Sequence, residues 1–172
     1  MKEILADYNF TELKRLAEEM GERSFRAKQL FDGVMRGHDI SGIPALPAAF
    51  VQRLLGRFED CALKIVKTLI SSDGTEKYLY KLADGNIIEG VFMRYKYGNT
   101  LCVSTQVGCR MGCKFCASTL GGLVRDLTPG EMLSQVLKVN ALHGGTPAKR
   151  QVTNVVLMGS GEPLDNYGNV IK

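Results

Sequence analysis

The sequence predicts an α/β protein: an N-terminal helical accessory part, a small β-sheet, and then the start of an α/β core. Three observations predict this class. Apolar residues recur with a helical period in the first sixty residues. Short runs rich in β-branched and aromatic residues follow, separated by hairpin signals. Beyond these runs the order strand, loop, helix, strand is that of a βαβ unit. We therefore expect three parts, covering residues 1–60, 61–97 and 98–172.

The first part is expected to contain three amphipathic helices. The first covers residues 9–20, with Asn9 or Thr11 as its N-cap and Gly21 at its end. Ser24 is expected to cap the second, which ends near residue 37. A loop with two prolines leads to the third helix at residues 48–58. Nothing in this part suggests catalysis.

The hydrophobic pattern then changes to that of strands, which we expect at residues 65–70, 76–82 and 87–94. Asp73-Gly74 and Asp84-Gly85-Asn86 separate these runs and are typical of tight hairpin turns. The pattern predicts a meander of antiparallel strands.

A βαβ unit is expected in the third part. Its first strand is predicted at residues 101–106. Thr128, Pro129 and Glu131 form the cap, first turn and third position of a helix that runs to about residue 142. The compact apolar run at residues 152–158 predicts a buried parallel strand.

Composition excludes several classes of protein. The chain has 172 residues, no apolar stretch long enough to span a membrane, and no secretory signal at its N-terminus. Between Arg94 and Arg150 there are eight basic and two acidic residues. Such an excess favours a polyanionic partner, most plausibly nucleic acid, although an ordinary solvated basic face would look the same.

The cysteine pattern points to a metal site in a reducing compartment. Cys109, Cys113 and Cys116 form a C-x3-C-x2-C motif, and the total of five cysteines is odd. Three thiolates on one short loop suit a [4Fe–4S] cluster that leaves one iron without a protein ligand. A structural zinc site, which normally needs four protein ligands, and three unligated thiols remain the alternatives.

A glycine-rich segment follows the predicted strand at residues 152–158. It reads Gly159-Ser160-Gly161-Glu162-Pro163, and ligands of parallel α/β proteins bind at such strand ends. The glycines allow close backbone approach, and the Glu162 carboxylate is a suitable acceptor for an ammonium group. By itself the segment is weak evidence, because Gly and Pro also mark plain turns.

Together the two motifs resemble those of radical S-adenosylmethionine (SAM) enzymes. The resemblance implies a [4Fe–4S] cluster held by the three cysteines, SAM bound by Gly161 and Glu162, and a partial (βα)6 barrel. The segments at residues 100–109, 120–127 and 153–159 narrow it to the RlmN/Cfr family, which methylates adenosine in 23S ribosomal RNA and, in part, in transfer RNA. The helical part resembles the family's RNA-binding accessory domain.

The resemblance also assigns two further roles. Cys102 matches the resolving cysteine, which releases the methylated RNA through a transient disulfide, and Glu89 matches the proton acceptor. Without the resemblance they would be a buried strand residue and an exposed strand carboxylate. Pro163 favours the C2-methylating branch over the C8-methylating one. A cytoplasmic monomer reduced by a donor such as flavodoxin, with no membrane association, is implied as well.

The chain departs from the family at its C-terminal side. No cysteine follows Cys116, whereas the family carries its methyl group on a cysteine near the C-terminus. Only 56 residues follow Cys116, and a βα unit of a barrel takes about 30. We expect an N-terminal fragment that does not methylate RNA alone. The remaining alternatives are a C8-methylating enzyme and a non-catalytic RNA-binding module with a structural metal site.

Overall fold

The computed structural model describes residues 2–172, and its N-terminal helices form a module with a core of its own. The three helices are α1 (Phe10–Glu19), α2 (Phe25–Met35) and α3 (Ala48–Arg57). Short 3-10 turns lie at Leu5–Asp7 and Ile40–Gly42. The three predicted helices are confirmed. Within residues 2–172, no helix combines the length and the apolar character that crossing a membrane requires.

The helix caps are partly as predicted. The Asn9 side chain accepts a hydrogen bond from the Glu12 amide at 3.0 Å, and the Glu12 carboxylate accepts one from the Asn9 amide at 2.7 Å, which completes a capping box. The prediction of Ser24 as a side-chain cap is wrong. Its backbone is already helical, with φ −54° and ψ −27°, and its side chain makes no capping hydrogen bond.

A five-stranded sheet follows, in the order β1-β2-β3-β4-β7. Its strands are β1 (Leu63–Ile70), β2 (Glu76–Leu82), β3 (Ile87–Tyr95), β4 (Gly98–Cys102) and β7 (Asn154–Val156). The first four are antiparallel neighbours, as the hairpin signals predict. The Asp73 and Asp84 carboxylates each accept a backbone N–H two residues on, which shapes the turns. Strands from residues 61–97 and 98–172 thus share one sheet.

The predicted strand at residues 101–106 is in fact two strands. β4 ends at Cys102, and β5 (Gln106–Gly108) pairs with β6 (Leu123–Asp126) in a separate ribbon that the sequence did not predict. The break has a physical cause at Ser104. Its amide donates to the Gln135 side chain and its carbonyl accepts from the same side chain, both at 2.9 Å. The buried Gln135 amide thereby replaces a neighbouring strand as the hydrogen-bonding partner.

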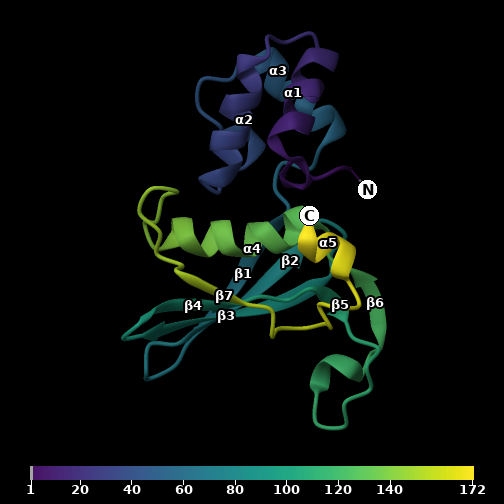
Figure 1. The fold of residues 1–172 in the computed structure, drawn as a ribbon, viewed down its shortest axis with the longest axis vertical. Helices are drawn as coiled ribbons and strands as arrows, with labels where there is room; N and C mark the ends of the chain where they lie inside the picture. The colour runs from purple at the N-terminus through teal and green to yellow at the C-terminus, as the bar shows by residue number, and fades with distance from the viewer. Residues whose placement is uncertain (1) are drawn as a thin grey trace.

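Helix α4 (Pro129–Leu142) connects β4 to its parallel neighbour β7, which confirms the βαβ unit. Figure 1 shows α4 lying across one face of the sheet, between the sheet and the helical module. The short helix α5 (Tyr167–Ile171) ends the described chain. The prediction of a buried strand at residues 152–158 is wrong in its burial: β7 is three residues long and Val155 is 46% exposed. Among the described residues β7 pairs only with β4, so it forms an edge.

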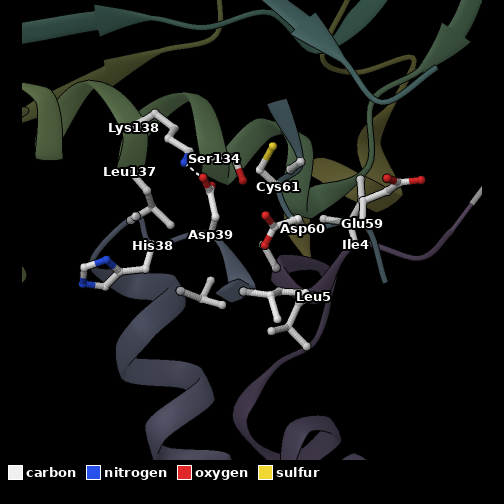
Figure 2. Close-up of a pocket in the computed structure, with 15 residues that line it drawn as sticks. Ile4, Leu5, His38, Asp39, Glu59, Asp60, Cys61, Ser134, Leu137 and Lys138 are labelled. Carbon is white, nitrogen blue, oxygen red and sulfur yellow. Dashed lines mark hydrogen bonds and ion pairs between the residues drawn. The ribbon is translucent and has the colours of Figure 1, made fainter. Parts of the chain in front are cut away.

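The helical module docks on α4 through polar contacts. The Asp7 carboxylate accepts the Gly130 amide at 2.6 Å, at the N-terminus of α4. Asp39 forms an ion pair with Lys138 further along the helix. Figure 2 shows Asp39 and Lys138 at a small cavity together with Cys61, whose thiol pKa is raised by burial. No predicted site residue lines this cavity.

Arg125 on β6 connects three elements. It forms two hydrogen bonds of 2.8 Å with the Glu131 carboxylate at the start of α4, and one of 2.6 Å with Asp84 in the β2–β3 turn. Burial alone would raise the pKa of Asp84, but the hydrogen bonds from Arg125 and Asn86 outweigh it and lower that pKa to about 2. The ribbon of β5 and β6 is thereby fixed to the sheet and to α4.

Candidate functional site

The cysteine motif lies on the loop that joins β5 to β6. Its first member, Cys109, is buried at the base of the loop, where its amide donates to the Gly122 carbonyl at 3.1 Å. Cys116 is half-buried, and its amide donates to the Cys113 carbonyl at 3.0 Å. Cys113 is exposed. Figure 1 shows the loop projecting from the sheet on the side away from the helical module.

The three thiols share one loop without forming a coordination set. Across residues 2–172, no group of three or more His, Cys, Asp or Glu side chains is arranged to hold a metal ion, and all five cysteines are free thiols. The donor chemistry of the loop is nevertheless uniform. Residues 109–122 contain three cysteines and no His, Asp or Glu. Thiolates alone suit iron–sulfur clusters, so the residues present fit a cluster of that kind.

The glycine-rich segment lies against the residues that lead into the cysteine loop. The amides of Thr105 and Gln106 both donate to the Ser160 carbonyl, at 2.9 and 3.1 Å. Gly161 has φ +106°, and a Cβ there would stand 2.6 Å from the Cβ of Gln106. Only glycine fits this close approach. Segments about fifty residues apart in the sequence are therefore in direct contact.

Gln106 is the side chain that holds the two motifs together. It is fully buried, and its Oε1 accepts the Glu162 amide at 2.9 Å. Its Nε2 donates to Asp126 at 2.8 Å and to Asp165 at 3.0 Å. Asp165 also forms an ion pair with Arg110 inside the cysteine motif, which lowers the pKa of the Asp165 carboxyl. Gln106 therefore connects β6, through Asp126, to the loop that carries Glu162 and Asp165.

The Glu162 side chain is half-buried and faces its own turn. Its Oε1 accepts the Leu164 amide at 3.0 Å. Beside the segment, Thr105 Oγ1 is buried and makes no hydrogen bond among the described residues. It stands 2.7 Å from where a Cβ on Gly161 would be. A buried polar atom without a partner next to Gly161 is what a polar ligand at this segment would satisfy.

Glu89 lies where the two motifs meet. It lines a cavity of about 240 Å³ together with Ala117 and Ser118 of the cysteine loop and Ser160 of the glycine-rich segment. The Ser104 hydroxyl donates to the Glu89 carbonyl at 2.7 Å and accepts the Ser160 amide at 2.9 Å. The Glu89 carboxylate pairs with Lys77 at 2.6 Å. The structure therefore brings Glu89 to both motifs.

Cys102 lies on β4, between β3 and β7, and opens into a different cavity of about 620 Å³. Burial raises the pKa of its thiol; the Met158 amide opposes this, and the nearby Glu89 carboxylate raises the pKa further. The thiol is therefore protonated at neutral pH. Glu89 and Cys102 are close enough to interact, although they line separate cavities.

Sequence reasoning missed the residues that position the site. Besides Gln106 they include Asn166, which is buried and donates to the Thr105 and Leu127 carbonyls at 2.8 and 2.9 Å. Asp165 and Ser104 complete the set. One signal was available: Gln106 is an amide three residues before the first cysteine of the motif, and a buried amide needs several partners.

Known proteins resemble this chain along its whole length. It is 52% identical over 172 residues to a protein of Clostridium acetobutylicum named "Probable dual-specificity RNA methyltransferase RlmN", matching 99% of the chain and 48% of that relative. A protein of the same name from Clostridium perfringens strain 13 is 52% identical over 175 residues, matching 100% of the chain and 49% of the relative. No family model matches the chain.

A solved structure is similar as well. It is described as a radical SAM methyltransferase from Sphaerobacter thermophilus, with a TM-score of 0.89 and 37% identity over 98% of this chain and 50% of that one. The chain spans about half the length of the relatives that it matches.

Proposed function

Because this chain belongs to the RlmN family of RNA methyltransferases, we propose that it forms the part of a radical SAM enzyme that binds the iron–sulfur cluster and SAM. The observation that carries the proposal is the direct contact between the glycine-rich segment and the residues that lead into the cysteine loop. Gln106 and the Ser160 carbonyl hold them together next to the cavity that Glu89 lines.

In this proposal Cys109, Cys113 and Cys116 hold a [4Fe–4S] cluster, and Gly161 and Glu162 bind SAM. The cluster, once bound, supplies the electron that cleaves SAM reductively. The residues of this chain position the segment that binds SAM. Gly161 lets the glycine-rich segment pack directly against Gln106 and Thr105, because no side chain stands there, and Gln106 fixes the Glu162 amide. The unpaired Thr105 hydroxyl offers a further polar contact.

Two side chains would act on the RNA. We propose Glu89 as the acceptor of the proton that the adenine loses, since a carboxylate at the meeting point of the motifs suits general-base chemistry. Cys102 would release the RNA from the methyl-carrying cysteine of the family, to which the base is bound through the transferred carbon. Its thiolate would attack that cysteine's sulfur, so that a disulfide forms, the sulfur–carbon bond breaks and the methylated base leaves and takes up a proton. Because burial raises the pKa of the Cys102 thiol, the thiol must lose its proton before it attacks.

Cluster binding is tested by anaerobic reconstitution of the chain with iron and sulfide. We expect a brown protein with broad visible absorbance and an electron paramagnetic resonance signal after reduction, which changes when SAM is added. The Cys113→Ala variant should lose at least about tenfold in bound iron, because one of the three proposed ligands, the exposed one, is gone. Cys61→Ala is the matched control and should keep its cluster, since Cys61 lies between the helical module and α4. A colourless protein with stoichiometric zinc would instead support a structural metal site.

The proposed substrate is adenosine in 23S ribosomal RNA and in transfer RNA, with methylation at C2. The relatives' name, dual-specificity RNA methyltransferase, supports two RNA targets. The test joins this chain to the half of the Clostridium acetobutylicum relative that it does not match, in cells that lack their own enzyme of this family. Nucleoside mass spectrometry of each RNA should then show 2-methyladenosine. The appearance of 8-methyladenosine would assign the chain to the C8 branch.

A further inference from the structure

Two tyrosines at the end of the β3–β4 hairpin are exposed to solvent and stack on each other. The Tyr95 and Tyr97 ring centroids are 5.0 Å apart and their planes differ by 8°. The two residues are 45% and 77% exposed, although the chain has two apolar cores that take up other aromatic rings. The Tyr95 hydroxyl donates to the Met93 sulfur at 3.2 Å, which helps to fix its ring. The pair is thus a preformed flat apolar surface.

The same pair lies at a cavity that also contains a proposed functional residue. Tyr95 and Tyr97 line the cavity of about 620 Å³ into which Cys102 opens, and its other lining residues are mostly apolar. This volume is within the range of pockets that hold small organic groups such as a nucleobase. A base bound in this cavity would therefore lie against residues that include Cys102 and the tyrosine pair.

Exposed cations lie on the hairpin and on the segment bonded to it. Lys96 lies between the two tyrosines in the sequence and is exposed, and Arg94 precedes them. The hairpin is also fastened to the segment that carries the exposed Lys149 and Arg150, because the Asn99 side chain donates to the Gln151 carbonyl at 2.9 Å. Arg94 is paired with Glu76, so Lys96, Lys149 and Arg150 are the cations offered to a partner. Their charge is complementary to a phosphate backbone.

We propose that Tyr95 and Tyr97 form a stacking platform for an unpaired base of the RNA substrate, with Lys96 contacting the adjoining phosphate. The inference rests on the proposed function, which makes the partner an RNA. Flat aromatic faces flanked by Lys and Arg are how proteins bind single-stranded nucleic acid. An aliphatic protein partner would have no use for the cations, and a membrane surface would not explain the cavity that the tyrosines share with Cys102.

The experiment measures binding of the chain to a short RNA stem–loop that carries 2-aminopurine in its unpaired loop. Wild-type protein should quench the fluorophore by stacking and should bind the stem–loop more tightly than the matching duplex. Tyr97→Ala should weaken binding by about 5- to 150-fold, the effect of losing one aromatic–base stack. Tyr97→Phe keeps the ring and should bind as the wild type does. Tyr167→Ala is the matched control, since Tyr167 is 58% exposed on α5, away from the hairpin.

Salt dependence separates stacking from charge. Lys96→Ala should reduce the slope of log affinity against log salt by about one, whereas Tyr97→Ala should leave the slope unchanged. Circular dichroism would confirm that each variant is folded. RNA binding that is indifferent to Tyr97, or equally weakened by Phe and Ala, overturns this inference alone. If the wild type binds anionic phospholipid vesicles but no RNA, both the stacking inference and the proposed RNA substrate are contradicted. Cluster reconstitution remains a separate test of cluster and SAM binding.

Discussion

Arg125→Met is expected to lower the free energy of unfolding by about 3–5 kcal/mol, the usual effect of removing one partner of a buried ion pair. The change leaves the carboxylate of Glu131, which is 2% exposed, without its two hydrogen bonds from the guanidinium. It also frees Asp84 and so detaches the β2–β3 turn from β6. Urea unfolding followed by circular dichroism measures the loss.

The control for Arg125 is an exposed pair of the same kind. Lys28 and Asp32 are paired on the surface of α2, with side chains 71% and 48% exposed, so Lys28→Met should cost less than about 1 kcal/mol. Acid provides a second readout. Asp84 titrates at about 2 in the folded protein and near 3.9 when unfolded, so its contribution is present above about pH 4 and is lost as the pH falls through about 2. This acid-induced loss should shrink in Arg125→Met. Equal losses of unfolding free energy in Arg125→Met and Lys28→Met would contradict the stabilising role given to the buried Arg125 pairs.

Gly108→Ala is expected to reduce the iron content after reconstitution by about tenfold or more, the scale on which residues that orient ligands act. Gly108 has φ +74°, and a Cβ there would stand 2.0 Å from the Gly122 carbonyl oxygen. That oxygen accepts the Cys109 amide, so the base of the loop must open and the first thiol must move. Iron and sulfide analysis, with the visible absorbance, measures the effect.

Gly21→Ala is the matched control for backbone strain. Gly21 has nearly the same φ, +73°, but nothing lies within 4 Å of a Cβ there, and it follows α1 in the helical module. It should cost about 1–2 kcal/mol of stability and leave the iron content unchanged. Full cluster occupancy in Gly108→Ala would show that the base of the loop tolerates a shift, and that Cys109 is not held there for the cluster.

Much of the fold was predictable because its signals are local. The Asp-Gly turns and the capping box at Thr128 specify hairpins and a helix start within a few residues, and the structure has them there. The end of β4 at Cys102 was not predictable. It depends on Gln135, which is 31 residues from Ser104 and reaches it only once α4 has packed on the sheet.

The candidate site also has parts that can be predicted from the sequence and parts that cannot. The cysteine spacing and the Gly161-Glu162 pair can be recognised in the sequence because each motif is contiguous. The sequence does not reveal that Glu89 lies beside both motifs, since the position of Glu89 is set by the pairing of β3 with β2 and β4. Nor do the motifs indicate the Tyr95–Tyr97 stack, because exposure of a ring depends on what the rest of the chain leaves uncovered.

The separate core of the helical module has a consequence for synthesis on the ribosome. Its buried residues all lie between Leu5 and Phe58, so this core can close while the sheet is still being translated. β4 must wait for β7, more than fifty residues later, and until then one of its edges is open to wrong pairing. The order of emergence therefore gives the nascent chain one folded unit while the edge of β4 is still unpaired.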